Sequence, residues 1–338
     1  MERKLLKNTS LDEFIKMLRE KDRCVIAPVR KNDRVDFEVI TEGQTIAQDY
    51  VQTVQSPKHV LFPRVEELFH YEQTEDGVTL HENDLAQLPE IVLFGVRPCD
   101  TIGLKALLSF FSIDYTDALF NKRKEKTTII ALSCTTADEY CFCTSVGGDP
   151  GGISGSDILL THLPDGDYLA EIITEKGQTI VDLAPDLFEP DQKIKKEEIL
   201  AKVPKHFSGI QLAQRLAVLF DSDLWVQQSL RCLGCGACAF VCPVCACFDI
   251  QDEGNQNRGQ RLRCWDSCGF SLFTLHTSGH NPREVQSQRW RQRIMHKFSY
   301  MPENQHLLGC VGCGRCARIC PADMNILEHL KAIVEERQ

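Results

Sequence analysis

The sequence of 338 residues contains no long apolar run and no strongly basic character. No stretch reaches the roughly 18 apolar residues that identify a membrane-spanning helix, and the chain begins MERKLLKN with no apolar signal segment. The formal net charge of -10 argues against a surface that binds nucleic acid. We therefore expect a cytoplasmic protein with no membrane insertion and no nucleic-acid partner.

The sequence also lacks the common signatures of catalysis and of nucleotide binding. It has no G-x-G-x-x-G or P-loop motif, no H-E-x-x-H pair, and no evident Ser-His-Asp or paired-carboxylate arrangement. The glycine-rich stretch 146–156 (VGGDPGGISGS) matches neither phosphate-binding motif, and we interpret it as a flexible turn. We assign no catalytic side chain and do not expect this chain to bind NAD itself.

Cysteine, by contrast, is abundant. Among the 17 cysteines, the string Cys-x2-Cys-x2-Cys-x3-Cys-Pro occurs twice, which is the bacterial ferredoxin ligand run for a [4Fe-4S] cluster. The copies are Cys232, Cys235, Cys238, Cys242 with Pro243, and Cys310, Cys313, Cys316, Cys320 with Pro321. A set of disulfide bonds does not explain the cysteines well, because disulfide-rich proteins are typically short secreted chains. Zinc sites rarely use this three-plus-one spacing.

The spacing also indicates how two clusters would share these eight thiolates. Three closely spaced cysteines wrap a loop around one cluster, and the intervening glycines let the backbone pass close to it. In two-cluster ferredoxins the fourth cysteine of each run ligates the other cluster. We therefore predict cluster 1 on Cys232, Cys235, Cys238 and Cys320, and cluster 2 on Cys310, Cys313, Cys316 and Cys242.

Four more cysteines follow predicted strands in the first half of the chain. Cys99 ends the segment IVLFGVRPC, whereas Cys134, Cys141 and Cys143 follow the run TTIIAL. Because ligands gather beyond the carboxyl ends of the strands of an α/β sheet, these four thiols predict a third [4Fe-4S] cluster. The alternative is that they are small buried residues, which is common for single cysteines.

A last group of cysteines lies between the two ferredoxin runs. Cys245, Cys247, Cys264 and Cys268 are candidates for a fourth cluster. Otherwise they pack beside the clusters or form a redox-sensitive pair. The remaining cysteine, Cys24, is expected to be a core residue rather than a ligand.

The same insert carries a group of cations, namely Arg289, Arg291, Arg293, His296 and Lys297. We interpret this group as the solvated face of a helix. The alternative is that the cations lie near anionic clusters or dock an acidic partner.

The apolar pattern predicts an α+β protein that begins with an α/β domain over residues 1–205. A helix is expected over 10–21, with Ser10 and Glu13 as its capping box. Another is expected after Cys99, capped by Asp100 or Thr101. Predicted strands cover 24–29, 59–62, 91–96, 127–132, 156–161 and 168–173, and the turn at 164–167 joins the last two as a hairpin.

From about residue 206 the strand signals fade and helical periodicity dominates. The 67 residues between Cys242 and Cys310 include SLFTLH and REVQSQRWRQRIMHKF, which we predict to be helical. This wide spacing resembles the α-helical ferredoxin domains of fumarate reductase and heterodisulfide reductase subunits. We therefore expect residues 206–338 to form a mostly helical ferredoxin-like domain with two [4Fe-4S] clusters.

The order of these motifs resembles a known family. GVRPCD, SIDYTD, LSC, CFC and SDILLT are followed by CLGCGACAFVCPVCACF, RCWDSC, HKF and GCVGCGRC, so that the resemblance covers roughly residues 60–338. Together they are similar to the iron–sulfur subunits of anaerobic sulfite reductases and to the beta subunits of cytoplasmic sulfhydrogenases. The resemblance implies a role between a flavin-containing, NAD(P)-binding partner, which carries FAD, and a catalytic subunit of the hydrogenase or sulfite reductase type.

We accordingly expect an electron-transfer subunit of an oxidoreductase complex that has no catalytic site of its own. A second hypothesis is a catalytic subunit that binds a flavin or substrate near Cys99 and the glycine-rich stretch. A third is a structural zinc scaffold. Bound flavin in the isolated chain favours the second hypothesis, and zinc without brown colour favours the third.

Overall fold

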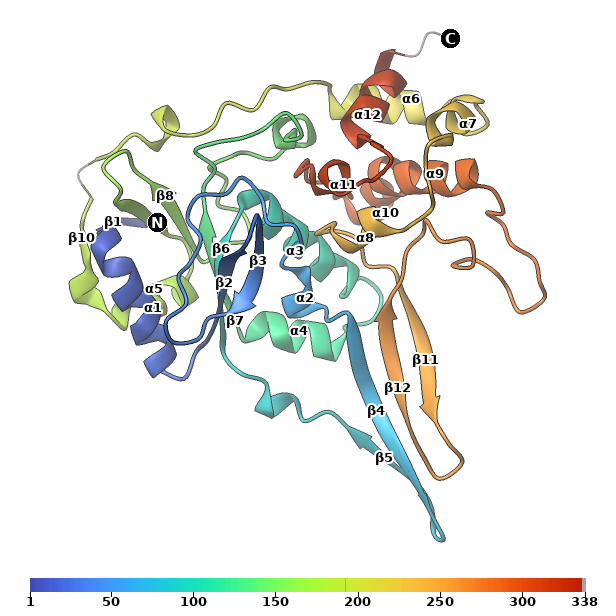
Figure 1. The fold of residues 1–338 in the computed structure, drawn as a ribbon, viewed down its shortest axis with the longest axis horizontal. Helices are drawn as coiled ribbons and strands as arrows, with labels where there is room; N and C mark the ends of the chain where they lie inside the picture. The colour runs from blue at the N-terminus through green and yellow to red at the C-terminus, as the bar shows by residue number, and fades with distance from the viewer. Residues whose placement is uncertain (192, 336–338) are drawn as a thin grey trace.

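The computed structural model describes residues 1–191 and 193–335 and contains both helices and sheets (Figure 1). It has one large sheet near the N-terminus, a smaller sheet, and a group of short helices toward the C-terminus. The α+β class expected from the sequence is confirmed at this level. Among the described residues, no helix is both long and apolar enough to cross a membrane.

The large sheet has eight strands, and its central strands are parallel. The order is β10 (Phe188–Pro190), β1 (Glu2–Leu6), β9 (Tyr168–Ile172), β8 (Ile158–His162), β7 (Thr127–Leu132), β6 (Ile91–Val96), β2 (Cys24–Lys31) and β3 (Arg34–Val39). Strands β6 and β7 are buried at every residue, in keeping with the β-branched and apolar runs IVLFGV and TTIIAL. The predicted hairpin is present as the antiparallel pair β8–β9.

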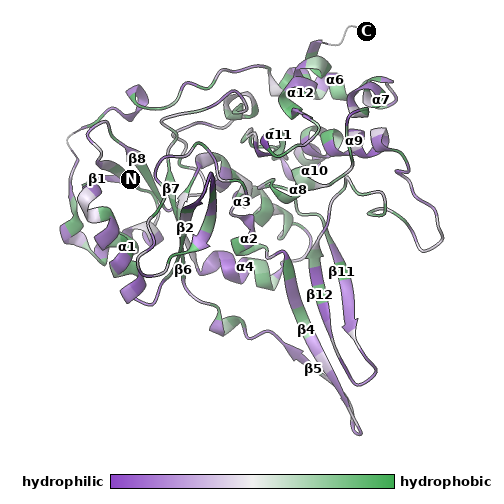
Figure 2. Cartoon of the chain, in the orientation of Figure 1, coloured by the Kyte–Doolittle hydropathy of each residue, from purple (hydrophilic) through white to green (hydrophobic). Residues whose placement is uncertain are grey.

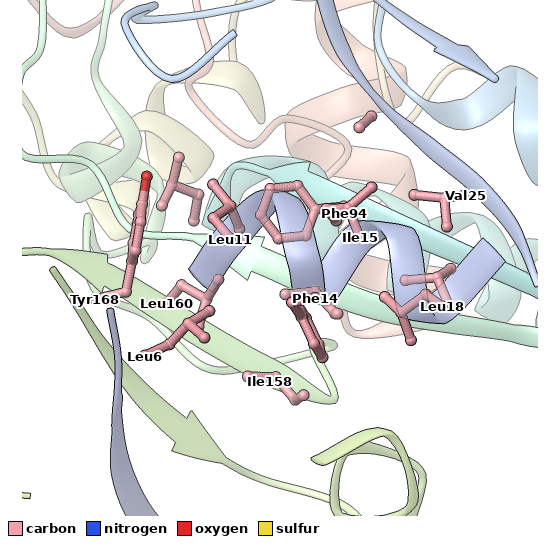
Figure 3. Close-up of a cluster of buried hydrophobic side chains, with 14 of the residues drawn as sticks. Leu6, Leu11, Phe14, Ile15, Leu18, Val25, Phe94, Ile158, Leu160 and Tyr168 are labelled. Atoms are coloured by element: carbon pink, nitrogen blue, oxygen red, sulfur yellow. The ribbon is translucent and has the colours of Figure 1, made fainter. Parts of the chain in front are cut away.

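Helices cover both faces of this sheet. On one face lie α1 (Leu11–Glu20) and α5 (Glu175–Asp182), and Figure 3 shows Phe14 and Leu18 of α1 in the same cluster of buried side chains as the sheet residues Phe94 and Ile158. The other face carries α2 (Lys58–Leu61), α3 (Pro98–Phe110) and α4 (Ala118–Glu125). A mostly parallel sheet with helices on both faces is the layered arrangement of α/β folds.

Some local predictions were wrong. Residues 59–62 lie mainly in the short helix α2 rather than in a strand. The capping box of Ser10 does not form, because Ser10 lies in a preceding 3-10 turn, Asn8–Ser10, with helical backbone angles. Helix α3 begins at Pro98, with Arg97 as its N-cap and the Asp100 carboxylate accepting from the Arg97 N–H. Cys99 therefore lies in the first turn of the helix.

A second sheet joins the two halves of the chain. Its order is β11 (Phe248–Gly254), β12 (Arg258–Trp265), β4 (Val65–Thr74) and β5 (Gly77–Glu82), all antiparallel. Hydrophilic colours dominate β11 in Figure 2, and the strand is mostly exposed. The prediction of a mostly helical C-terminal domain is therefore not confirmed, because this hairpin in the insert pairs with a strand from the first domain.

The remaining elements of the C-terminal part are short helices. They are α6 (Gly209–Leu216), α7 (Leu224–Ser229), α8 (Ala237–Phe240), α9 (Gln286–Met295), a π-helical turn (His296–Tyr300), α10 (Met301–Gln305), α11 (Arg315–Arg318) and α12 (Ile326–Glu335). Before residue 206, further 3-10 turns occur at Leu85–Gln87, Cys143–Val146, Pro185–Leu187 and Lys196–Glu198.

The helices predicted in the insert between the cysteine runs are confirmed in part. The predicted helix in REVQSQRWRQRIMHKF is present, whereas SLFTLH forms turns. Helices α6, α7, α9 and α12 share one apolar core.

The helical part lies against the carboxyl edge of the large sheet. Gly103 of α3 packs on Pro243, the proline that follows the first cysteine run, and an added Cβ would lie 2.6 Å from the proline side chain. Gly312, in the second run, packs equally closely on the backbone of Phe142 and Cys143. Both cysteine runs therefore contact the edge at which the parallel strands end.

Candidate metal centres

The first cysteine run faces one cavity together with the last cysteine of the second run. The cavity is lined by Cys232, Cys235, Cys238 and Cys320, the four residues predicted for cluster 1, and also by Cys268 and Cys316. The backbone turns tightly here, because Gly234 and Gly236 have φ angles of 67° and 73°. An added Cβ on Gly236 would lie 2.4 Å from the Phe270 ring.

Two hydrogen-bond donors point at sulfur atoms of this cavity. The Gln286 side-chain amide donates to Cys232 Sγ over 3.0 Å, and the Met324 backbone N–H donates to Cys320 Sγ over 3.3 Å. Such donors stabilise a thiolate and tune any metal that it holds. The cradle, the four converging thiols and the donors fit a [4Fe-4S] cluster.

Cys242, the last cysteine of the first run, packs in one buried cluster with Val311 and Cys313 of the second run. Burial and the negative charges of Cys242 and Cys313 raise the pKa of Cys310 to about 11, although the charge of Lys297 acts to lower it. Burial also raises the pKa of Cys316 to about 12, with contributions from Cys313 and Cys310. The four residues predicted for cluster 2 are therefore electrostatic neighbours. Metal binding would replace the protons that these thiols carry in the free protein.

The four cysteines predicted for a third cluster also meet in the structure. Burial, together with the neighbouring thiolates of Cys134 and Cys141, raises the pKa of Cys143 to about 12. The pKa of Cys99 is raised well above its usual value by burial, with Asp100, Cys313 and Cys134 contributing. Cys99 follows β6 and Cys134 follows β7, so the parallel sheet brings these two to a common edge.

This third group has its own sulfur-directed donors. The Gln52 amide donates to Cys99 Sγ over 2.9 Å, and Arg318 Nη2 donates to Cys141 Sγ over 3.4 Å. Arg318 also pairs with Asp138. Gln52 and Arg318 belong to no recognisable sequence motif and were not predicted. Their role depends on contacts between segments that are far apart along the chain.

The structure divides the last group of cysteines. Cys245, Cys247 and Cys268 line a second cavity of about 330 Å³. Cys264 does not line it, because its position on β12 places it beside Gln251 and the acidic Asp249 and Glu253. Cys24 is half-buried and packs against the apolar core, as expected.

Two members of the cationic group are not solvated, which corrects the interpretation of a solvated helix face. Arg293 and Lys297 are one helical turn apart and are both buried. Lys297 Nζ lies 3.4 Å from Cys242 Sγ and donates to the Gly309 carbonyl over 2.6 Å. Their spacing of four residues places them on one face of the helix, and the structure shows that this face is directed inward. Arg291 instead lies over the Phe220 ring, and Arg289 donates to the carbonyls of Arg283 and Glu284.

Within residues 1–191 and 193–335, no three His, Cys, Asp or Glu side chains lie close enough to hold a single metal ion. A [4Fe-4S] cluster makes a different demand, since its four thiolates surround a cube of iron and sulfide.

Comparison with known proteins agrees with the cysteine pattern. Residues 231–324 match the family model of a 4Fe-4S dicluster domain, which spans both ferredoxin runs and the insert between them. Sulfhydrogenase 2 subunit beta of Pyrococcus furiosus is 35% identical over 334 residues, covering 96% of each chain. No solved structure matches the chain. The chain belongs to the family of sulfhydrogenase beta subunits, iron–sulfur electron-transfer proteins with [4Fe-4S] clusters.

Proposed function

We propose that this chain relays single electrons between a flavin-containing, NAD(P)-binding subunit and a catalytic subunit of the hydrogenase or sulfite reductase type. In this proposal Cys232, Cys235, Cys238 and Cys320 hold cluster 1, Cys310, Cys313, Cys316 and Cys242 hold cluster 2, and Cys99, Cys134, Cys141 and Cys143 hold cluster 3. FAD is carried by the partner. The observation that carries the proposal is the direct contact between the second ferredoxin run and the third group of cysteines.

That contact is made by backbone and side chains together. The Phe142 N–H donates to the Gly312 carbonyl over 2.9 Å, which places the loop of Cys141 and Cys143 against the loop of Cys310 and Cys313. Cys313 also contributes to the raised pKa of Cys99. These contacts support the passage of electrons between clusters 2 and 3 in the proposed relay.

When bound, the clusters accept and release single electrons. The chain's own residues hold the thiolates, direct donors at their sulfur atoms and exclude water. Val241, Val311 and Ala317 are buried around the ferredoxin runs, and such apolar surroundings help to set the reduction potential.

The first cavity reaches the protein surface, which supports electron exchange with a partner there. Cys235 is exposed, and the nearby Leu230 and Leu233 are 78% and 71% exposed. Exposed apolar residues of this kind are typical of interaction surfaces when they cluster. The relative's name describes one subunit of a sulfhydrogenase, and this supports the proposal that the chain acts within a complex.

The test is anaerobic purification of the complex, with identification of its other chains and of the cofactor on each. We expect flavin on a partner and none on this chain. Flavin released from the isolated chain on denaturation would instead support the catalytic alternative.

A variant of the same complex tests cluster 3. Cys99→Ala should lower the iron content by about four atoms per chain, while the EPR signals of clusters 1 and 2 remain. Unchanged iron would remove cluster 3 from the proposal.

A further inference from the structure

The second cavity contains ligand-type side chains that none of the three proposed clusters uses. Its walls include Cys245, Cys247, Cys268 and His296, with Phe110, Phe248 and Phe273 among the apolar residues. Three of these ligands come from sequence segments on either side of the β11–β12 hairpin, and His296 opens the π-helical turn after α9. Such turns within a helix occur frequently at functional sites.

The thiols in this cavity lie close together. The Asp266 N–H donates to the Cys247 carbonyl over 2.9 Å, which holds the segment of Cys268 beside Cys247. Lys297, which lines the same cavity, lies 3.4 Å from Cys242 Sγ. The cavity therefore adjoins cluster 2 through Cys242. It also adjoins cluster 1, because Cys268 lines the first cavity as well. A group bound here would lie beside both ferredoxin-type sites.

Buried positive charge faces the same space. Arg293 is 6% exposed, and its Nη1 atom is buried and has no hydrogen-bond partner among the described residues. Lys297 is 4% exposed, and within the described part of the chain neither cation forms a salt bridge with a carboxylate. Buried cations need anionic partners. Both line this cavity, and an anionic ligand inside it would supply one.

We infer that this cavity holds a fourth iron–sulfur cluster, bound by Cys245, Cys247 and Cys268 with His296 as the fourth ligand. Three thiolates and one imidazole, which coordinates metal in its neutral form, complete a set of four around one cavity. Sulfide and thiolate bring the negative charge that Arg293 and Lys297 face. This site goes beyond the proposed relay through clusters 1 to 3, and it excludes Cys264.

Iron and labile sulfide counting tests the site in the intact, anaerobically purified complex. Cys247→Ser should lower both counts by about four per chain. The matched control is Cys264→Ser, which removes a cysteine from the same insert but outside the cavity and should change neither count. Equal counts in wild type and Cys247→Ser would overturn the proposal. Clusters 1 to 3 and the proposed function would survive that result, because Cys247 is not a ligand of any of these three clusters.

A second measurement does not depend on whether Cys247→Ser folds, and it tests His296 as a cluster ligand. Pulsed EPR of the reduced wild-type complex should show nitrogen hyperfine coupling to one cluster, and His296→Cys should retain the iron but lose this coupling. Coupling that persists in His296→Cys, or that is absent from the wild type, overturns the assignment of His296. Zinc in this cavity, or a Cys247–Cys268 disulfide found by mass spectrometry of the anaerobic protein, overturns the cluster itself.

Discussion

Arg315 and Asp100 form a fully buried pair that joins the second ferredoxin run to the α/β domain. Each side chain is 1% exposed, and Arg315 Nη2 donates to Asp100 Oδ2 over 2.9 Å while Nη1 contacts the other carboxylate oxygen. Arg315 directly precedes Cys316, and Asp100 directly follows Cys99. The pair therefore fixes a proposed ligand of cluster 2 relative to a proposed ligand of cluster 3.

Removing one member of this pair should leave a buried charge without its partner. We expect Arg315→Met to destabilise the protein by about 3–5 kcal/mol, as for other broken buried ion pairs. The double variant Arg315→Met with Asp100→Leu should regain more than half of that loss, because neither charge then remains. Anaerobic thermal unfolding measures both. A double variant no more stable than Arg315→Met would contradict a charge-pair role.

Crossed ligation predicts which cysteine variants resemble one another. Cys320→Ser should remove the same EPR signal as Cys232→Ser, although the two residues belong to different runs. Likewise, Cys242→Ser should resemble Cys310→Ser. Spectra of the four reduced variants distinguish this arrangement from ligation of each cluster by one run, in which Cys320→Ser and Cys310→Ser would share a phenotype.

Alanine substitutions at two glycines with positive φ angles distinguish the cost of backbone strain from the cost of a steric clash. Gly147 has a φ of 81° and no atom within 4 Å of an added Cβ, so Gly147→Ala should cost only the roughly 1–2 kcal/mol of a left-handed backbone. Gly312 has a φ of 65°, and its Cβ would lie 2.5 Å from Cys143 N. Gly312→Ala should therefore cost more and should also release iron. Equal melting temperatures and iron contents in the two variants would argue against the close contact between loops.

The buried ammonium of Lys297 lies 3.4 Å from Cys242 Sγ, a proposed ligand of cluster 2. It should raise the reduction potential of this cluster, because it stabilises the negative charge that reduction adds. Lys297→Met should lower that potential by on the order of 100 mV, for a charge several ångströms away in a partly polar interior. EPR-monitored redox titration measures the shift. The control is Lys16→Met, an exposed lysine on α1, which should leave every potential unchanged. An unchanged or higher potential in Lys297→Met would show that Lys297 does not face a cluster.

Sequence alone predicted the parts of the fold that depend on local pattern. The runs at 91–96 and 127–132, which are rich in apolar and β-branched residues and contain no charge, form the buried central strands, since strands covered on both faces have no solvated side. The strand predicted at residues 59–62 was wrong, because a run of four residues does not distinguish a strand from a helical turn. The exposed strand β11 was missed, because pairing with β12 rather than burial holds it in place.

The candidate ligands follow from local sequence patterns, whereas the residues that surround them do not. Cysteine spacing indicates a cluster loop directly, whereas Gln52, Arg315 and the buried orientation of Arg293 depend on contacts across the chain. The grouping of Cys264 with Cys245, Cys247 and Cys268 followed sequence proximity. The hairpin instead carries Cys264 to a position beside Asp249, away from the cavity.

The most direct measurement is the iron and acid-labile sulfide content of the anaerobically purified chain. Four sets of ligands predict brown protein with about sixteen of each per chain, and clusters 1 to 3 alone predict about twelve. About eight of each would contradict the cluster proposed at Cys99, Cys134, Cys141 and Cys143. Colourless protein that contains zinc and no labile sulfide would contradict the account as a whole.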